Sequence, residues 1–127
     1  MSLLAPVSWG ELIDKITILE IKAARIAEPA KLANVKRELA ALAKTRDAQG
    51  QAPAALADLA QKLRQVNETL WRIEDQIREC EAKRDFGAAF VELARSVYRT
   101  NDKRARLKRR VNELMGSELV EEKSYKG

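Results

Sequence analysis

The sequence predicts an all-α fold of two antiparallel helical hairpins, the second of them a long coiled-coil hairpin. Two observations carry this prediction. Alanine, leucine, glutamate, arginine and lysine make up 72 of the 127 residues, a composition typical of long helices and coiled coils. Apolar residues also recur at alternating spacings of three and four along most of the chain, which is the helical period. We expect a single helical domain over residues 1–127.

The first helix is expected over residues 9–27. Ser8 and Glu11 have the spacing of a capping box, in which the serine hydroxyl accepts a hydrogen bond from a backbone N–H of the first turn. One continuous apolar stripe follows: Leu12, Ile16, Leu19, Ala23 and Ile26. Further isoleucines widen this stripe, so the helix should contact more than one neighbour.

The second helix is expected over residues 29–48, antiparallel to the first. The Glu28–Pro29 step ends the first helix, because the residue before a proline is pushed out of the helical region, and proline suits the first turn of the next helix. The apolar residues that face the first helix are Leu32, Val35, Leu39 and Leu42. A polar stretch with glycine and proline at residues 47–53 predicts a loop.

The third and fourth helices are expected over residues 54–84 and 88–115, with a tail at 117–127. The third has the clearest coiled-coil seam of the chain: Leu56, Leu59, Leu63, Val66, Leu70, Ile73, Ile77 and Cys80. An antiparallel register with index sums near 174 pairs apolar residues of both helices, for example Leu63 with Val111. The same register predicts three flanking ion pairs: Glu79 with Arg95, Asp75 with Arg99, and Glu68 with Arg106.

The two hairpins differ in length, which predicts a homodimer. At 1.5 Å per residue the second helix spans roughly 29 Å and the third roughly 46 Å. We expect the short hairpin to pack along part of the long one. The rest of the long hairpin then lacks cover, and a second copy of the chain would complete the bundle. We expect the interface on the broad apolar face of the first helix, at Trp9, Ile13, Ile16 and Ile21.

The composition argues against most familiar catalytic chemistry. The chain contains no histidine, so imidazole bases and histidine metal ligands are missing, and its carboxylates lie close to lysines or arginines. We predict no enzymatic activity, no cofactor and no metal. The single cysteine, Cys80, cannot form an intrachain disulfide, which favours the cytoplasm. No apolar run approaches the length of a membrane span, and the first residues do not form a signal peptide.

The fourth helix holds the basic excess of the chain. Residues 95–110 carry a net charge of +7, whereas the whole chain carries +5. Five basic residues share one helical face: Arg95, Arg99, Lys103, Arg106 and Arg110. This face could bind nucleic acid or another polyanion, yet the predicted register assigns three of these arginines to carboxylates of the third helix, and no aromatic residues interleave for base stacking.

A polar layer interrupts the seam halfway along the long hairpin. Thr100, Asn101 and Arg104 fall where apolar residues are expected, opposite Leu70 and Ile73. Such a layer is exposed to solvent, satisfied by the third-helix carboxylates Glu74 or Asp75, or open to a ligand or partner, and a buried polar layer also fixes the register. The residues of this candidate site are Trp71, Glu74, Asp75, Tyr98, Arg99, Asn101 and Asp102.

Three long segments carry a family resemblance: residues 7–22 (VSWGELIDKITILEIK), 66–78 (VNETLWRIEDQIR) and 90–125 (FVELARSVYRTNDKRARLKRRVNELMGSELVEEKSY). These strings resemble an uncharacterised family of short bacterial all-helical proteins, and the match covers nearly the whole chain. The resemblance implies a complete bacterial protein or module, and it supplies no catalytic residues.

Three functions remain open on these grounds. The first is a non-enzymatic cytoplasmic adaptor or regulatory module that presents its helices to another protein. The second is nucleic-acid or other polyanion binding through the basic face of the fourth helix. The third is a small-ligand site in the layer around Trp71 and Asn101.

Overall fold

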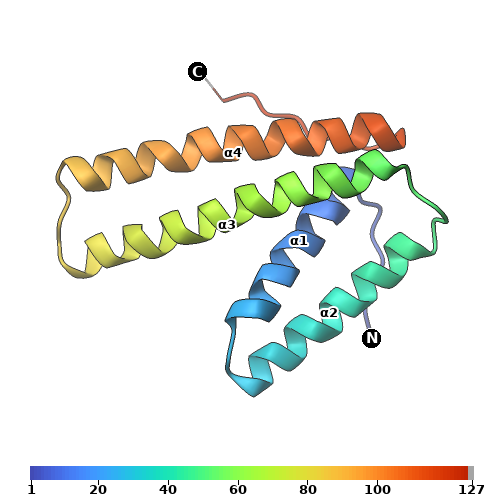
Figure 1. Ribbon diagram of the computed structural model, residues 1–127, viewed down its shortest axis with the longest axis horizontal. Coiled ribbons are helices and arrows are strands. Elements are labelled where there is room, and N and C mark those ends of the chain that lie inside the picture. Colours follow the sequence, from blue (N-terminus) through green and yellow to red (C-terminus); the bar gives the residue numbers. More distant parts are fainter. Residues whose placement is uncertain (126–127) are drawn as a thin grey trace.

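The computed structural model describes residues 1–125 and contains four α-helices (Figure 1). They are α1 (Trp9–Arg25), α2 (Pro29–Asp47), α3 (Ala54–Ala82) and α4 (Ala88–Met115). No strand occurs within residues 1–125, so the all-α class is confirmed. Residues 126 and 127 of the predicted tail lie outside the described residues.

Local backbone geometry explains where the helices end. α1 stops at Arg25, two residues before the predicted end, because Ile26 is already extended (φ −78°, ψ 125°) ahead of the Glu28–Pro29 step. α3 stops at Ala82, since Arg84 has a left-handed φ of 53° that a helix cannot hold. α4 ends as expected at Gly116, whose φ of 62° closes the helix without a Cβ penalty.

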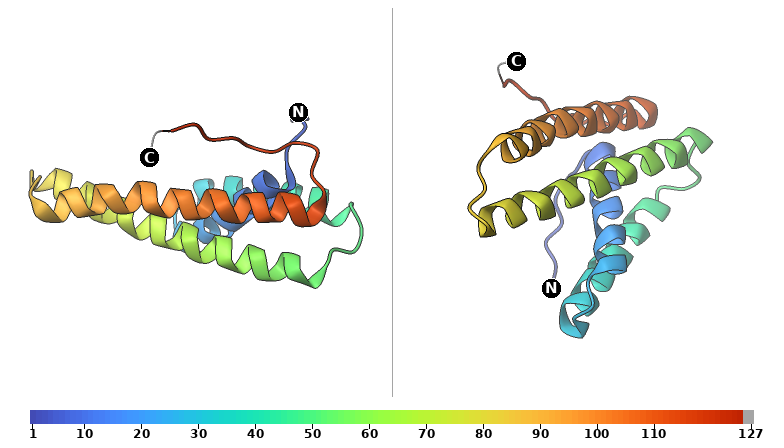
Figure 2. Two further views of the ribbon diagram at one scale, coloured as in Figure 1. Left: turned by 90° about the horizontal axis from the view of Figure 1, so that it is seen from above. Right: turned by 60° about the vertical axis from the view of Figure 1, so that its left-hand side comes forward.

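The two hairpins cross rather than lie along one another. α3 and α4 run antiparallel down the long axis, and α1 crosses both near the start of α3 and the end of α4 (Figures 1 and 2). α1 contacts α2, α3 and α4, whereas α2 contacts α1 and no other helix. The expectation that the short hairpin packs along the long one is therefore wrong. α1 buries its first half against α3 and α4, and the α1–α2 hairpin then projects away from them.

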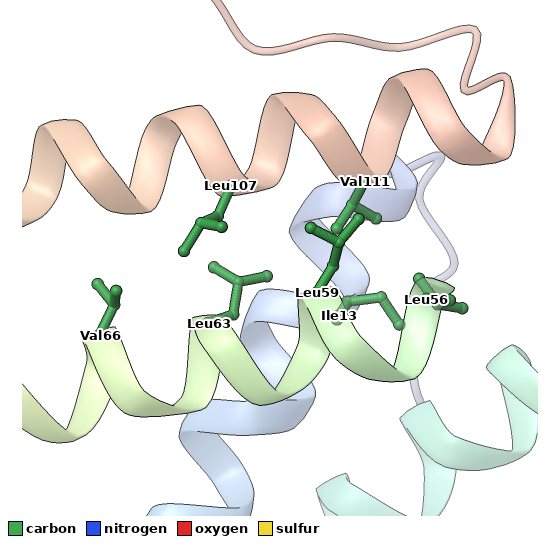
Figure 3. Packing of buried hydrophobic residues seen from close by; sticks show 7 residues of the cluster. All are labelled: Ile13, Leu56, Leu59, Leu63, Val66, Leu107 and Val111. Atoms are coloured by element: carbon green, nitrogen blue, oxygen red, sulfur yellow. The ribbon is translucent and has the colours of Figure 1, made fainter. Parts of the chain in front are cut away.

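The core lies at this crossing (Figure 3). Ile13 of α1 packs among residues of α3 and α4: Leu56, Leu59, Leu63, Val66, Leu107 and Val111. Leu63 and Val111 are fully buried. In Figure 3, Leu107 lies across from Leu63 and Val111 lies across from Leu59, one helical turn away from the predicted pairing of Leu63 with Val111. The short turn between Ala82 and Ala88 is centred on residue 85, and a tight hairpin about that centre gives index sums near 170 instead of 174.

α2 is the least covered helix. None of its residues is buried, although it carries the predicted apolar stripe of Leu32, Val35, Leu39 and Leu42. These four side chains are half-buried, since only α1 packs on them. The fold thus leaves one amphipathic helix with a single intramolecular neighbour.

Candidate functional site

A buried polar cluster joins three helices at the crossing. Asp14 and Thr17 come from α1, Asn67 from α3 and Arg104 from α4. The Asn67 amide donates to Asp14 Oδ1 at 2.9 Å and to Thr17 Oγ1 at 3.0 Å, and the Thr17 hydroxyl donates to the backbone carbonyl of Asp14 at 2.7 Å. Arg104 forms a two-pronged ion pair with the Asp14 carboxylate, with Nε 2.9 Å from Oδ1 and Nη2 bonded to Oδ2.

The α1 and α3 members of this cluster are closed to solvent, Arg104 is partly exposed at its edge, and the cluster is internally satisfied. Asp14 is 1% exposed, Thr17 2% and Asn67 6%. No buried side-chain nitrogen or oxygen within residues 1–125 lacks a hydrogen-bond partner. The hydrogen bond to Asp14 raises the pKa of Arg104 further above its ordinary value, so the guanidinium stays charged. The cluster therefore positions α1 on α3 and α4, and it offers no free group for catalysis.

A second polar cluster lies where α1 begins. The backbone of Gly10 approaches α4 so closely that its N–H donates to Asn112 Oδ1 at 2.6 Å. The predicted cap forms, because the Ser8 hydroxyl accepts from the Glu11 N–H at 3.0 Å. The Glu11 carboxylate pairs with Lys108 of α4 at 2.8 Å. The start of α1 is thus attached to the last turns of α4.

The C-terminal tail folds back along α4 and is held by the same cluster. Glu121 accepts hydrogen bonds from the Ser8 hydroxyl and, at 3.0 Å, from the Asn112 amide. Two further ion pairs continue along α4: Glu122 with Arg109 and Lys123 with Asp102, both at 2.9 Å. The tail therefore closes over the junction of α1 and α4 (Figure 2).

Glu121 is the tail carboxylate that reaches both α1 and α4. Partial burial opposes its ionisation. The hydrogen bonds from Ser8, from its own backbone N–H and from Asn112, together with the charge of Lys108, outweigh that effect and lower the pKa of Glu121 below 4.5. A lowered folded-state pKa means that Glu121 stabilises the attached tail fully above pH 4.5, and that this contribution is lost as the pH falls through the lower pKa.

We therefore expect the tail to detach from α4 in acid before the helices unfold. The protection of amides near Glu121 is measured by NMR from pH 6 to pH 3 as the exchange rate relative to that of an unstructured chain at the same pH. It should be lost as the pH falls through the lowered pKa of Glu121, while the amides around Leu63 stay protected. In Glu121→Gln the tail should exchange quickly at every pH. Glu122→Gln is the matched control, because this exposed neighbour is bonded only to Arg109 and should leave the acid transition in place. A transition that survives in Glu121→Gln would contradict the assignment.

The candidate ligand layer is not assembled by the fold. Trp71 lies beneath Arg25 of α1, with the guanidinium 5.5 Å from the ring centroid, and Glu74 pairs with Arg78 of its own helix. Arg99 pairs with Glu92 and Asp102 with the tail residue Lys123. The remaining members lie apart from these pairs: Asp75 and Tyr98 are exposed and Asn101 is half-buried. Of the polar layer, Arg104 alone reaches a buried partner, and that partner is on α1.

The basic face of α4 is exposed over its whole length. Arg95 and Arg99 both pair with Glu92 of α4, at 3.6 Å and 3.1 Å. The predicted pairs with α3 do not form: Glu79 bonds Lys83 and Glu68 bonds Arg64. The physical reason is the register, which differs by one turn from the predicted one. Lys103, Arg106 and Arg110 have no ion pair within residues 1–125.

The predicted interface residues of α1 lie inside the chain. Ile13, Ile16 and Ile21 are 2%, 3% and 2% exposed, and Trp9 packs against the core. This differs from the expectation that they meet a partner, because α1 crosses α3 and α4 and these side chains are covered by the chain itself.

The surface also has open cavities. One, of about 490 Å³, lies near the turn between α3 and α4 and is lined in part by Cys80, Leu93 and Ser96. Another is a groove of about 260 Å³ between α1 and α3, with Ile13 and Ile16 of α1 in its floor and Arg46 of α2 beside it. Within residues 1–125 there is no cluster of three potential metal ligands and no helix able to cross a membrane.

The fold and its polar clusters define a small all-helical protein in which two crossed hairpins are joined by buried hydrogen bonds. The chain belongs to the family of unknown function DUF6165, whose model matches residues 4–127. This confirms the resemblance to an uncharacterised family. Comparison with curated proteins and with solved structures found no match.

Proposed function

We propose that this protein is a non-enzymatic cytoplasmic interaction module that works as a homodimer, with the two copies joined through their α1–α2 hairpins. One observation carries the proposal: α2 bears an apolar stripe, yet it contacts α1 alone and buries none of its residues. An amphipathic helix usually owes its stability to packing of its apolar face. Because α2 has a single neighbour, we expect it to pack against a further partner.

The groove beside α2 supports a second copy as that partner. Its floor is apolar, with Ile13 and Ile16, and one wall is the alanine pair Ala57 and Ala60 of α3. Small residues in a groove wall allow a neighbouring helix to approach closely. Arg46 of α2 also lines the groove, so a two-fold axis beside α2 brings α2 of each copy to the groove of the other, as an isologous interface requires.

Charge favours the same arrangement. Arg46 and Arg64 line the groove but pair with Asp47 and Glu68, whereas Glu20 of the groove has no ion-pair partner within residues 1–125. α2 carries five basic and two acidic residues. A partner α2 in the groove therefore brings lysines or arginines to Glu20.

The polar clusters support a role without catalysis. Asp14, Asn67 and Arg104 satisfy one another and hold α1 at a fixed place on α3 and α4. A fixed crossing keeps the long α3–α4 pair, proposed to be a coiled coil, at a set angle to the dimerising hairpins. A fixed angle supports the proposed role of an adaptor that presents helical surfaces to other proteins.

The test uses one substitution at two places on α3. Ala57 is exposed and lines the groove, so Ala57→Arg fills the groove without touching the core, while Ala55→Arg introduces the same side chain at an exposed position 200° away around the helix. We expect wild type and Ala55→Arg to have twice the 14.3 kDa chain mass at micromolar concentration, measured by sedimentation equilibrium. Ala57→Arg should be monomeric.

Two controls keep this test decisive. Far-ultraviolet circular dichroism shows whether Ala57→Arg remains helical, and Gln61→Arg, one turn further along the groove wall, provides a second variant with the same expected result. A monomeric wild type at high micromolar concentration contradicts the proposal. A dimer that both groove variants leave intact contradicts it as well.

A further inference from the structure

The outer face of α4 is a row of basic side chains that the fold does not use. Arg95, Arg99, Lys103, Arg106 and Arg110 follow one another at spacings of four, four, three and four, and all five are exposed. At 1.5 Å per residue the row is roughly 22 Å long. Positions this far apart on one helix face form a straight stripe.

Most of this charge is left without intramolecular compensation. Within residues 1–125, Glu92 is the carboxylate that bonds to the row, and it serves both Arg95 and Arg99. The α3 carboxylates that the sequence places opposite the row bond to other residues or stay apart from it. If Glu92 and Glu113 of the same helix each compensate one of the five positive charges, the row still keeps an excess of three.

The tail and the dimer interface do not compete for this face. Tail residues bond Arg109, Asn112 and Asp102, which lie on a neighbouring side of α4, and none of the five basic residues bonds the tail. α2 does not contact α4, so the hairpin that we propose to dimerise lies elsewhere. The basic face of α4 is therefore accessible whether or not the proposed homodimer forms.

We propose that the outer face of α4 binds the phosphate backbone of double-stranded nucleic acid without sequence preference. A B-form duplex carries one negative charge per 1.7 Å of its axis, so about 13 phosphates accompany a face of this length. A single strand is disfavoured because no position of the row holds an aromatic residue for base stacking. Arginine and lysine contacts to phosphate provide affinity and orientation, and they carry no sequence information.

The test measures binding of a fluorescent 20-base-pair DNA duplex by anisotropy at several NaCl concentrations. Five phosphate contacts predict a slope of about −4.5 in log K against log salt, or roughly a 500-fold loss of affinity between 50 and 200 mM. Replacing Lys103, Arg106 and Arg110 with glutamine should reduce the slope to about −1.8 and weaken binding strongly at low salt.

A second triple variant separates the face from net charge. Arg72→Gln, Arg78→Gln and Lys83→Gln remove three positive charges from exposed positions of α3 and of the turn that follows it, away from the groove, and should leave the slope near that of the wild type. Equal effects of the two triple variants, or the absence of binding at 50 mM salt, would overturn the proposal. Equally tight binding of poly-glutamate would overturn the assignment to phosphate. All substituted residues are exposed, and circular dichroism verifies that both variants stay folded.

Discussion

The Asp14→Asn substitution is expected to lower the free energy of unfolding by about 3 kcal/mol relative to the wild-type protein. Asparagine has the size of aspartate but lacks the negative charge, so Arg104 loses the carboxylate that compensates its partly buried guanidinium. The Asn67 amide also loses a charged carboxylate as its hydrogen-bond acceptor. The loss exceeds that of a surface pair because water cannot replace the missing partner at a residue that is 1% exposed.

Chemical denaturation followed by circular dichroism measures this change. The neighbouring ion pair of Lys15 with Glu38 is the matched control, since it joins α1 to α2 with both side chains about half exposed, 52% and 46%. Glu38→Gln should cost less than about 0.5 kcal/mol. If Asp14→Asn costs no more than this control, the buried cluster does not hold α1 in place.

The Gly10→Ala variant is expected to destabilise the protein by about 1–3 kcal/mol, against the direction of helix propensity. Inside a helix, alanine is ordinarily more stable than glycine by roughly 1 kcal/mol. At Gly10, however, the added Cβ meets the backbone oxygen of Lys108 at 2.5 Å and the Asn112 Oδ1 at 3.0 Å. Backbone cannot rotate away as a side chain can, so α1 must shift relative to α4 and stretch the hydrogen bond from Gly10 to Asn112.

Thermal or chemical unfolding measures this effect, with Gly87→Ala as the control. A Cβ at Gly87 meets nothing closer than 3.5 Å, and the change there should stay below about 1 kcal/mol, the cost of alanine at a helix N-cap. A Gly10→Ala protein as stable as the wild type would show that α1 and α4 are further apart than described above.

The positions of the helices could be predicted because each boundary has a local cause. Ser8 caps α1, Pro29 begins α2 and Gly116 ends α4. The arrangement of these helices depends on contacts between residues far apart in the sequence. The alternating spacing of three and four between apolar residues does not fix which of them pair across two helices. Shifting one helix by a turn pairs Leu63 with Leu107 as well as it pairs Leu63 with Val111. The length of the turn at residues 83–87 decides between the two registers.

The polar cluster was missed for a related reason. Asp14, Thr17 and Asn67 each lie beside an apolar stripe, where a polar residue is ordinarily solvated. The polar break at Thr100–Arg104 was a true signal that a partner was needed, but the predicted partners were carboxylates of α3. The actual partner, Asp14, comes from α1, and only the crossing angle of the hairpins brings it to Arg104. No spacing within one helix encodes that angle.

In the proposed homodimer, the groove between α1 and α3 receives α2 of the second copy. Zero-length carbodiimide cross-linking of an equal mixture of ¹⁴N- and ¹⁵N-labelled protein tests it most directly, because mass spectrometry then separates links between chains from links within one chain. We predict mixed-isotope links between Glu20 and a lysine of α2, Lys36 or Lys44, which disappear in Ala57→Arg. Glu20 links that are confined to one isotope, or that persist unchanged in Ala57→Arg, would contradict the account.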